Sequence, residues 1–279
     1  MSWKITTLIE NHPDLEESLI CEHGFSLLIE GESFKMLLDT GKSGAFYDNA
    51  RALGESLGDL DCIIISHGHY DHAGGLMRIL EETRQQHKIY VGKGFFDGKY
   101  CTNREGEIYY NGIQFRRHDL EDYQVHVEEI GEDVREIAKG IHVHRNFERT
   151  VPYEQWNPRF FLKEGEEYVR DTFSDEMAIT LDTKEGLVVI VGCSHPGIVN
   201  ILKTIAERTG ERIRGVIGGT HLIDADEQRL QTTIEDFRRL GIEFIGVSHC
   251  TGDENLKVIQ EAFGNRFIFN CTGNKIYFE

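Results

Sequence analysis

Paired cysteines, surplus positive charge and long apolar runs are missing from this chain of 279 residues, and each absence argues against a class of protein. Its 6 cysteines are scattered without a Cys-x-x-Cys pair, which favours reduced thiols over a disulfide framework. Its 48 acidic residues outweigh 30 basic ones, and the net charge of −18 argues against a nucleic-acid or anionic-membrane surface. No apolar run approaches membrane-spanning length and no signal peptide is recognisable, so we expect a cytoplasmic protein.

Metal-ligating side chains are concentrated in one short segment. Ser66–His72 holds three histidines and one aspartate within six residues. The apolar run 61–65 before it predicts a buried strand. Imidazole and carboxylate ligands suit zinc, iron or manganese. Because one structural zinc would not take four ligands from a single glycine-containing turn, the pattern favours two metal ions side by side, each completed by residues from far along the chain.

The apolar patterns along the chain predict an α/β fold with a β-rich first half and a last third in which strands and helices alternate. The segment 92–175 has weak periodicity and many charges, so we expect it to contain sheet strands and an insertion over the active-site mouth. The predicted strands are 4–10, 25–30, 35–39, 61–65, 88–91, 125–127, 140–144, 177–181, 187–191, 215–217, 244–247, 266–270 and 275–278. The predicted helices are 46–53, 74–84, 198–208, 227–240 and 254–263.

Three of the late predicted strands are followed by a histidine in a polar, glycine-containing turn: His195, His221 and His249. Residues at the same end of a sheet converge in space, so we expect these histidines to meet the early cluster. The sequence supports two roles for His221 equally. It is either a metal ligand or a residue that hydrogen-bonds the substrate.

The segment Ser66–Leu76 resembles the signature of the metallo-β-lactamase superfamily, whose hydrolases and oxidoreductases are αββα sandwiches. This resemblance implies that residues 1–279 form one domain, an αββα sandwich with two mixed sheets and flanking helices. Other segments resemble one narrower group of that superfamily, the dihydropterin-methyl-ribofuranosylaminobenzene 5'-phosphate synthases linked to methanopterin biosynthesis. These segments are Thr6–Asn11, Glu22–Ser26, Leu38–Gly41, Gly192–Gly197, Gly218–His221 and Ser248–Gly252.

The resemblance also indicates how late residues complete the site. His249 is similar to the last ligand of the superfamily. Where the superfamily commonly has Gly-Asp, this chain has a Gly-Cys-Ser-His run that ends at His195. Either Cys193 takes the role of the aspartate as a thiolate, or His195 reaches into the site, and we favour His195. One usual histidine is not obvious, and Asp175 is a candidate for its place unless His195 supplies that ligand.

The resemblance implies a binuclear site with two divalent metal ions, for which zinc is expected first and manganese or iron are alternatives. The ligands expected for the first ion are His67, His69 and one late histidine, and those for the second are Asp71, His72 and His249. Asp39 precedes a Thr-Gly turn, and an aspartate at this place in the superfamily typically hydrogen-bonds the histidine loop.

We therefore expect a metal-dependent hydrolase or transferase, similar to the synthases named above, that acts on a phosphorylated small molecule. Asp71 would orient the nucleophilic water, and His221 would protonate the leaving group or stabilise developing negative charge. An alternative is a hydrolase of a phosphodiester, cyclic phosphate or lactone, which needs the same water and no pterin pocket. An alternative of another class is a metal-binding sensor with a degenerate site. The only feature that favours it is Cys193, which replaces the aspartate common in the superfamily. Neither nucleic acid nor a membrane is expected as a partner, and a homo-oligomer is left open.

Overall fold

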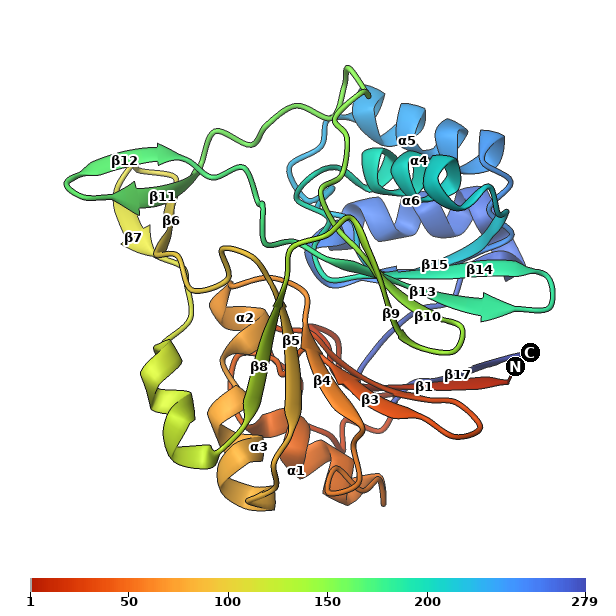
Figure 1. Ribbon diagram of the computed structural model, residues 1–279. Helices are drawn as coiled ribbons and strands as arrows, with labels where there is room; N and C mark the ends of the chain where they lie inside the picture. The colour runs from red at the N-terminus through yellow and green to blue at the C-terminus, as the bar shows by residue number, and fades with distance from the viewer. Residues whose placement is uncertain (1) are drawn as a thin grey trace.

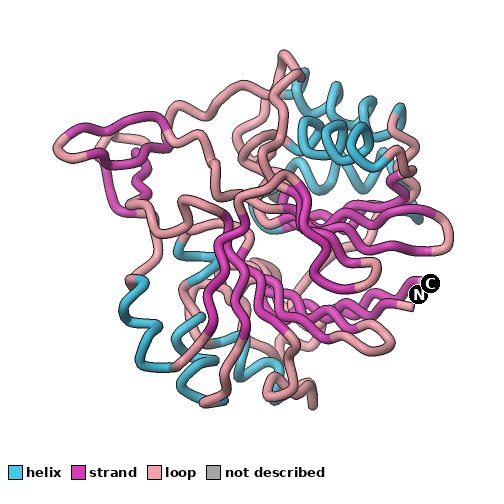
Figure 2. Tube along the Cα trace, viewed as in Figure 1, coloured by secondary structure: helices cyan, strands magenta, loops and turns pink. Residues whose placement is uncertain are grey.

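Two β-sheets pack face to face between two layers of helices in the computed structural model, which describes residues 2–279 (Figure 1, Figure 2). This is the αββα sandwich that the family resemblance implied. The first sheet has the order β17-β1-β2-β3-β4-β5-β8; it is antiparallel from β17 to β3 and parallel from β3 to β8. Its strands are β1 (Trp3–Ile9), β2 (Ser26–Glu30), β3 (Lys35–Leu38), β4 (Cys62–Ile65), β5 (Lys88–Gly92), β8 (His126–Ile130) and β17 (Lys275–Phe278).

The second sheet has the order β16-β15-β14-β13-β10-β9. It is parallel from β16 to β14 and antiparallel from β14 to β9, so both large sheets are mixed, as expected. Its strands are β9 (Val134–Ala138), β10 (Ile141–His144), β13 (Ala178–Thr183), β14 (Gly186–Val191), β15 (Ile213–Gly219) and β16 (Phe244–Ser248).

Helices cover the outer face of each large sheet (Figure 1). The helices on the side of the first sheet are α1 (Ala45–Ala52), α2 (Tyr70–Ala73) and α3 (Leu76–Thr83), and those on the second sheet are α4 (Ile198–Thr209), α5 (Glu227–Arg239) and α6 (Asp253–Phe263). Helix α5 begins where Asp226 accepts a hydrogen bond from the backbone N–H of Arg229, an N-cap that satisfies a donor the helix itself cannot.

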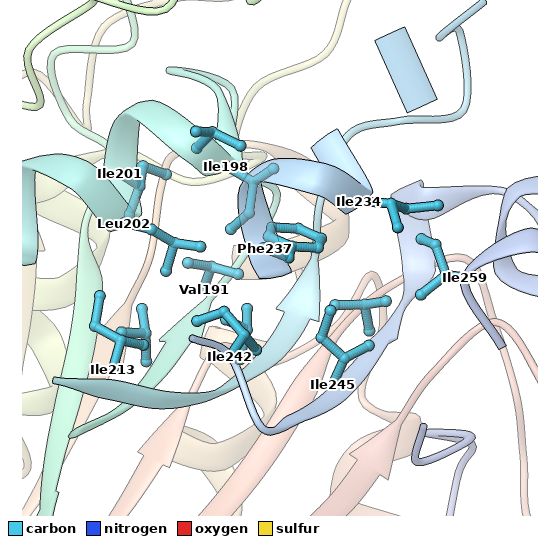
Figure 3. Close-up of a cluster of buried hydrophobic side chains, with 14 of the residues drawn as sticks. Val191, Ile198, Ile201, Leu202, Ile213, Ile234, Phe237, Ile242, Ile245 and Ile259 are labelled. Atoms are coloured by element: carbon cyan, nitrogen blue, oxygen red, sulfur yellow. The ribbon is translucent and has the colours of Figure 1, made fainter. Parts of the chain in front are cut away.

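The packing of α4 shows why this layered arrangement is stable. Its apolar residues recur at spacings of three and four and lie on one face, where they meet the second sheet and α5 (Figure 3). Burying each such side chain contributes about 1.5–3 kcal/mol relative to leaving it exposed. The buried residues of this face are Ile198, Ile201, Leu202 and Ile205. A separate apolar layer between the two sheets includes Ile5, Ile29, Ile64, Ile179 and Ile190.

A third, four-stranded sheet comes entirely from the segment 92–175 and lies at the upper left of Figure 1. Its order is β12-β11-β6-β7, and every neighbouring pair is antiparallel. Its strands are β6 (Lys99–Thr102), β7 (Ile108–Tyr110), β11 (Phe160–Glu164) and β12 (Glu167–Arg170). We call it the small sheet.

One predicted helix begins slightly later than expected, and one predicted strand is absent. The predicted helix 74–84 corresponds to α3, which begins after Gly75, and the short α2 precedes it and ends before Gly74. A side chain at either glycine would collide with backbone carbonyls of the 40–43 turn. The predicted strand 266–270 is wrong: this segment crosses from one sheet to the other, and Ile268 donates a single hydrogen bond to Ile245.

Within residues 2–279, no helix has both the length and the apolar character needed to cross a membrane.

Candidate metal centre

Two groups of metal-ligating side chains lie side by side where β4, β14 and β16 end. In each group, one ligand atom per residue lies within 4.8 Å of the others. The ring centroids of His67 and His72, one from each group, are 4.2 Å apart. Cys193 and His195 both reach the site, one in each group, although the sequence presented them as alternatives. The first group is His67, His69 and His195, and the second is Asp71, His72, Cys193 and His249.

The imidazole ligand atoms of these groups face one another. His67 Nε2 lies 3.1 Å from His69 Nδ1, and His72 Nε2 lies 3.2 Å from His249 Nε2. His69 Nε2 and both ring nitrogens of His195 are buried and have no hydrogen-bond partner within the described chain. Leaving a buried polar atom unpaired costs about 1–3 kcal/mol. Converging imidazole lone pairs of this kind fit metal ions.

Burial keeps the imidazoles of the first group in the form that binds metal. It lowers the pKa of His67, His69 and His195 well below the ordinary value for histidine, and the neighbouring histidines add to this effect. These rings are therefore neutral at pH 7, and each has a lone pair available for a cation.

A hydrogen-bond network behind the rings fixes their orientation. His72 Nδ1 donates to Asp39 Oδ2 at 2.6 Å, and Ser66 Oγ donates to the same oxygen at 2.7 Å. Ser66 Oγ also lies 3.0 Å from His67 Nδ1. Both rings therefore turn Nε2 toward the centre, the arrangement by which outer partners orient metal ligands. Asp39 thus contacts the histidine loop as expected, whereas no signal in the sequence pointed to Ser66.

The backbone around the site is held in conformations that few residues adopt. Asp39, Ser194, His221 and His249 all have φ between 47° and 63°, in the left-handed region. Gly192 is needed for another reason, because a Cβ there would collide with the hydroxyl of Ser66. The close approach of β14 to the histidine loop therefore depends on glycine.

Cys193 stands where the superfamily commonly has aspartate. Its Sγ lies 3.1 Å from His72 Nε2. Burial, together with the neighbouring Cys250, raises the pKa of the Cys193 thiol well above its ordinary value. Its thiolate therefore requires a cation beside it, and a bound metal ion would provide one.

Asp175 lies outside both groups and has other partners. Its Oδ2 accepts a hydrogen bond from the backbone N–H of Gly68 at 2.7 Å, and its Oδ1 accepts one from Lys99 Nζ at 2.8 Å. Lys99 also donates to Asp171 at 2.9 Å, and all three side chains are buried. Burial lowers the pKa of Lys99, but the two carboxylates outweigh it and raise that pKa above its ordinary value. This buried cluster joins the start of the small sheet to the histidine loop.

His221 also lies outside both groups, next to His195, with ring centroids 4.4 Å apart. Burial lowers its pKa to about 4, so the ring is neutral at pH 7.

Two further residues at the site were not among the candidates from the sequence, although each lies in a segment that resembles the narrower group, Thr6–Asn11 and Glu22–Ser26. His23 Nε2 lies 3.2 Å from Asp71 Oδ2, and its ring stacks on His249 with centroids 5.0 Å apart. Asn11 Oδ1 lies 3.0 Å from His249 Nδ1, which turns His249 Nε2 toward the centre. Both residues lie in loops without periodic pattern, so only the fold brings them here.

A cavity of about 240 Å³ opens onto both groups. Its walls come from the ends of strands in both large sheets and from the small sheet, which covers one side of the opening. The residues that the small sheet and its flanks contribute are Cys101, Tyr109, Asn111, Arg159 and Phe160.

The chain is similar to known proteins over nearly its whole length. The sequence profile of the Metallo-beta-lactamase superfamily matches residues 19–147. The 7,8-dihydropterin-6-methyl-4-(beta-D-ribofuranosyl)-aminobenzene-5'-phosphate synthase of Methanocaldococcus jannaschii is 31% identical over 273 residues, which cover 95% of this chain and 92% of that protein. The crystal structure of Tm1679, described as a metal-dependent hydrolase of the beta-lactamase superfamily, has a TM-score of 0.84 and 34% identity, with 98% of each chain covered. A diphosphatase from the PhnP family shares the fold, with a TM-score of 0.57, 12% identity, and coverage of 100% of this chain and 98% of that one.

Proposed function

Because this chain belongs to the metallo-β-lactamase superfamily, we propose that it is a binuclear metal-dependent enzyme that acts on a phosphorylated small molecule, in the manner of a dihydropterin-methyl-ribofuranosylaminobenzene 5'-phosphate synthase. The observation that carries the proposal is the pair of adjoining ligand groups, whose buried imidazole nitrogens face one another. Zinc is the metal that we expect first, with manganese or iron as alternatives.

Each of the two ligand groups would hold one metal ion. His67, His69 and His195 would hold the first ion, and the second group would hold the other. Cys193 would bind as a thiolate in place of the usual aspartate. When bound, the two ions would supply Lewis-acid contacts to a phosphoryl oxygen and would lower the pKa of a bound water.

The side chains around the centre have separate roles. Asp71 Oδ2 lies within 3.3 Å of both His23 Nε2 and His249 Nε2, so the carboxylate is fixed and positioned to accept a proton from water. His221 is neutral and lines the cavity, so it would donate a hydrogen bond to negative charge that develops on the substrate. This role needs no proton release, which suits a ring whose pKa is about 4.

Two reaction classes use these same groups. The similarity to the synthase favours transfer, in which a nucleophile displaces a diphosphate or phosphate from the substrate. The similarity to Tm1679, described as a metal-dependent hydrolase, favours a second candidate in which water attacks a phosphodiester, cyclic phosphate or lactone. Product analysis separates the classes, because only the transferase requires a second substrate.

The proposal is tested by metal content per chain and by turnover, measured on protein purified without added metal. We expect two metal ions in the wild type and fewer in both Cys193→Ala and His195→Ala. Asp71→Ala should abolish turnover of phosphoester, lactone and pterin substrates while the protein stays folded. His126→Ala, at an exposed position on β8, is the control and should keep full metal content and turnover.

Two results contradict the proposal. A fully active Asp71→Ala variant would remove the role of that carboxylate. A wild type that binds metal but turns over none of the three substrate types would support a metal-binding sensor instead.

A further inference from the structure

The cavity over the candidate metal centre has one strongly basic side chain. Among the residues within 2–279 that line it, Arg159 is the only lysine or arginine. The chain as a whole carries a net charge of −18, and Asp71 and Asp224 also line this cavity. A positive charge placed here therefore stands out against an acidic surrounding.

The small sheet holds this arginine in place. Arg159 comes directly before β11, and its Nε donates to the backbone carbonyl of Thr102, at the end of β6, at 3.1 Å. Its backbone carbonyl in turn accepts from the Thr102 N–H at 2.9 Å. The base of the guanidinium is thus anchored, and its Nη1 faces Asp224, which also lines the cavity.

Within residues 2–279, the outer end of Arg159 makes one ion pair, and this pair is weak. Its Nη1 lies 3.4 Å from Asp224 Oδ2, and the side chain of Asp224 is 52% exposed. An exposed pair of this length contributes little stability. A guanidinium has five N–H donors in a planar fork, and the two contacts above use two of them. The remaining donors suit an oxyanion that can replace Asp224.

Apolar and aromatic side chains line the same cavity as the arginine. Tyr109 is 44% exposed and Ile223 is 57% exposed, and both line the cavity together with the buried Phe160. Large apolar side chains exposed at a cavity mouth mark a ligand-binding surface. Their position next to Arg159 suits a flat ring that carries an anionic group.

We propose that Arg159 binds the phosphate group of an aromatic phosphate ester, displacing Asp224, while Tyr109 and Ile223 contact its ring. Guanidinium and phosphate form paired, charge-assisted hydrogen bonds, which a lysine cannot reproduce. The inference deepens the proposed function, on which it rests for the presence of a phosphorylated substrate. Arg159 is then a residue that selects the substrate, with no part in the bond-breaking step.

Equilibrium binding of phenyl phosphate to the metal-loaded protein, measured by titration calorimetry, tests the inference. We expect Arg159→Ala to weaken binding by roughly tenfold or more, since it removes charge-assisted hydrogen bonds to the phosphate. Arg159→Lys should fall between the wild type and Arg159→Ala, because it keeps the charge and loses the fork. Asp224→Asn should bind phenyl phosphate more tightly, because the competing carboxylate is gone.

Arg170→Ala is the matched control, since Arg170 is an exposed arginine on β12 of the same small sheet and does not line the cavity. Its affinity for phenyl phosphate should equal that of the wild type. Unchanged affinity in Arg159→Ala, or an equal loss in Arg170→Ala, would overturn the inference. Because binding is measured without turnover, these results are distinguishable from a failure of the proposed enzymatic activity.

Discussion

Replacing Lys99 by methionine removes the positive charge to which two buried carboxylates, those of Asp171 and Asp175, are bound. At the observed separations of 2.9 and 2.8 Å, each contact contributes about 6 kcal/mol of attraction at an effective dielectric constant of about 20, before desolvation is subtracted. Removing one partner of a buried ion pair costs about 3–5 kcal/mol, because the other charge stays buried and unpaired. We expect Lys99→Met to lose an amount in this range.

The assay is urea-induced unfolding at pH 7, with the free energy of unfolding extrapolated to water. The triple variant Lys99→Met, Asp171→Asn, Asp175→Asn should recover much of the loss, since it leaves no unpaired charge. Lys257→Met breaks an exposed ion pair with Glu254 and should show no measurable change. A loss below about 1 kcal/mol in Lys99→Met, or a triple variant less stable than the single one, would refute the reasoning.

Two further predictions concern the supports of the site and the core. Asp39→Asn weakens the hydrogen bonds that orient His72, so we expect metal affinity to fall by about 10- to 100-fold in competition with a chelator. Asp59→Asn, at an exposed carboxylate, is its control, and equal affinities in the two variants would contradict the role of Asp39. His144 is buried, and burial lowers its pKa in the folded protein to about 4. As the pH falls, His144 therefore takes up a proton in the unfolded protein at a higher pH than it does in the folded one. From pH 7 to pH 5 the wild type should therefore lose about 2 kcal/mol more stability than His144→Gln, as measured by urea unfolding at both pH values, and parallel losses would contradict this.

The family resemblance implied the αββα layering, and local patterns predicted most of the strands and helices that build it. Runs such as 187–191 and 215–217 are apolar throughout, as strands buried on both faces must be, and the helix 198–208 shows its apolar face at the correct period. The third sheet did not follow, since its strands come from 92–175, where charges and aromatic residues mask the period.

The sequence by itself also predicted that His195, His221 and His249 would lie close to the early cluster, but it did not predict that His23 would. Parallel strands carry their carboxyl ends to one edge, so histidines that follow β14, β15 and β16 converge near the motif after β4. Only the tertiary structure decided how Cys193 and His195 divide between the two groups, because a turn two residues long can direct either side chain inward. It alone decided the partners of Asp175, since Lys99 lies 76 residues away. Contacts over such separations depend on how the chain folds back on itself, which no local pattern records.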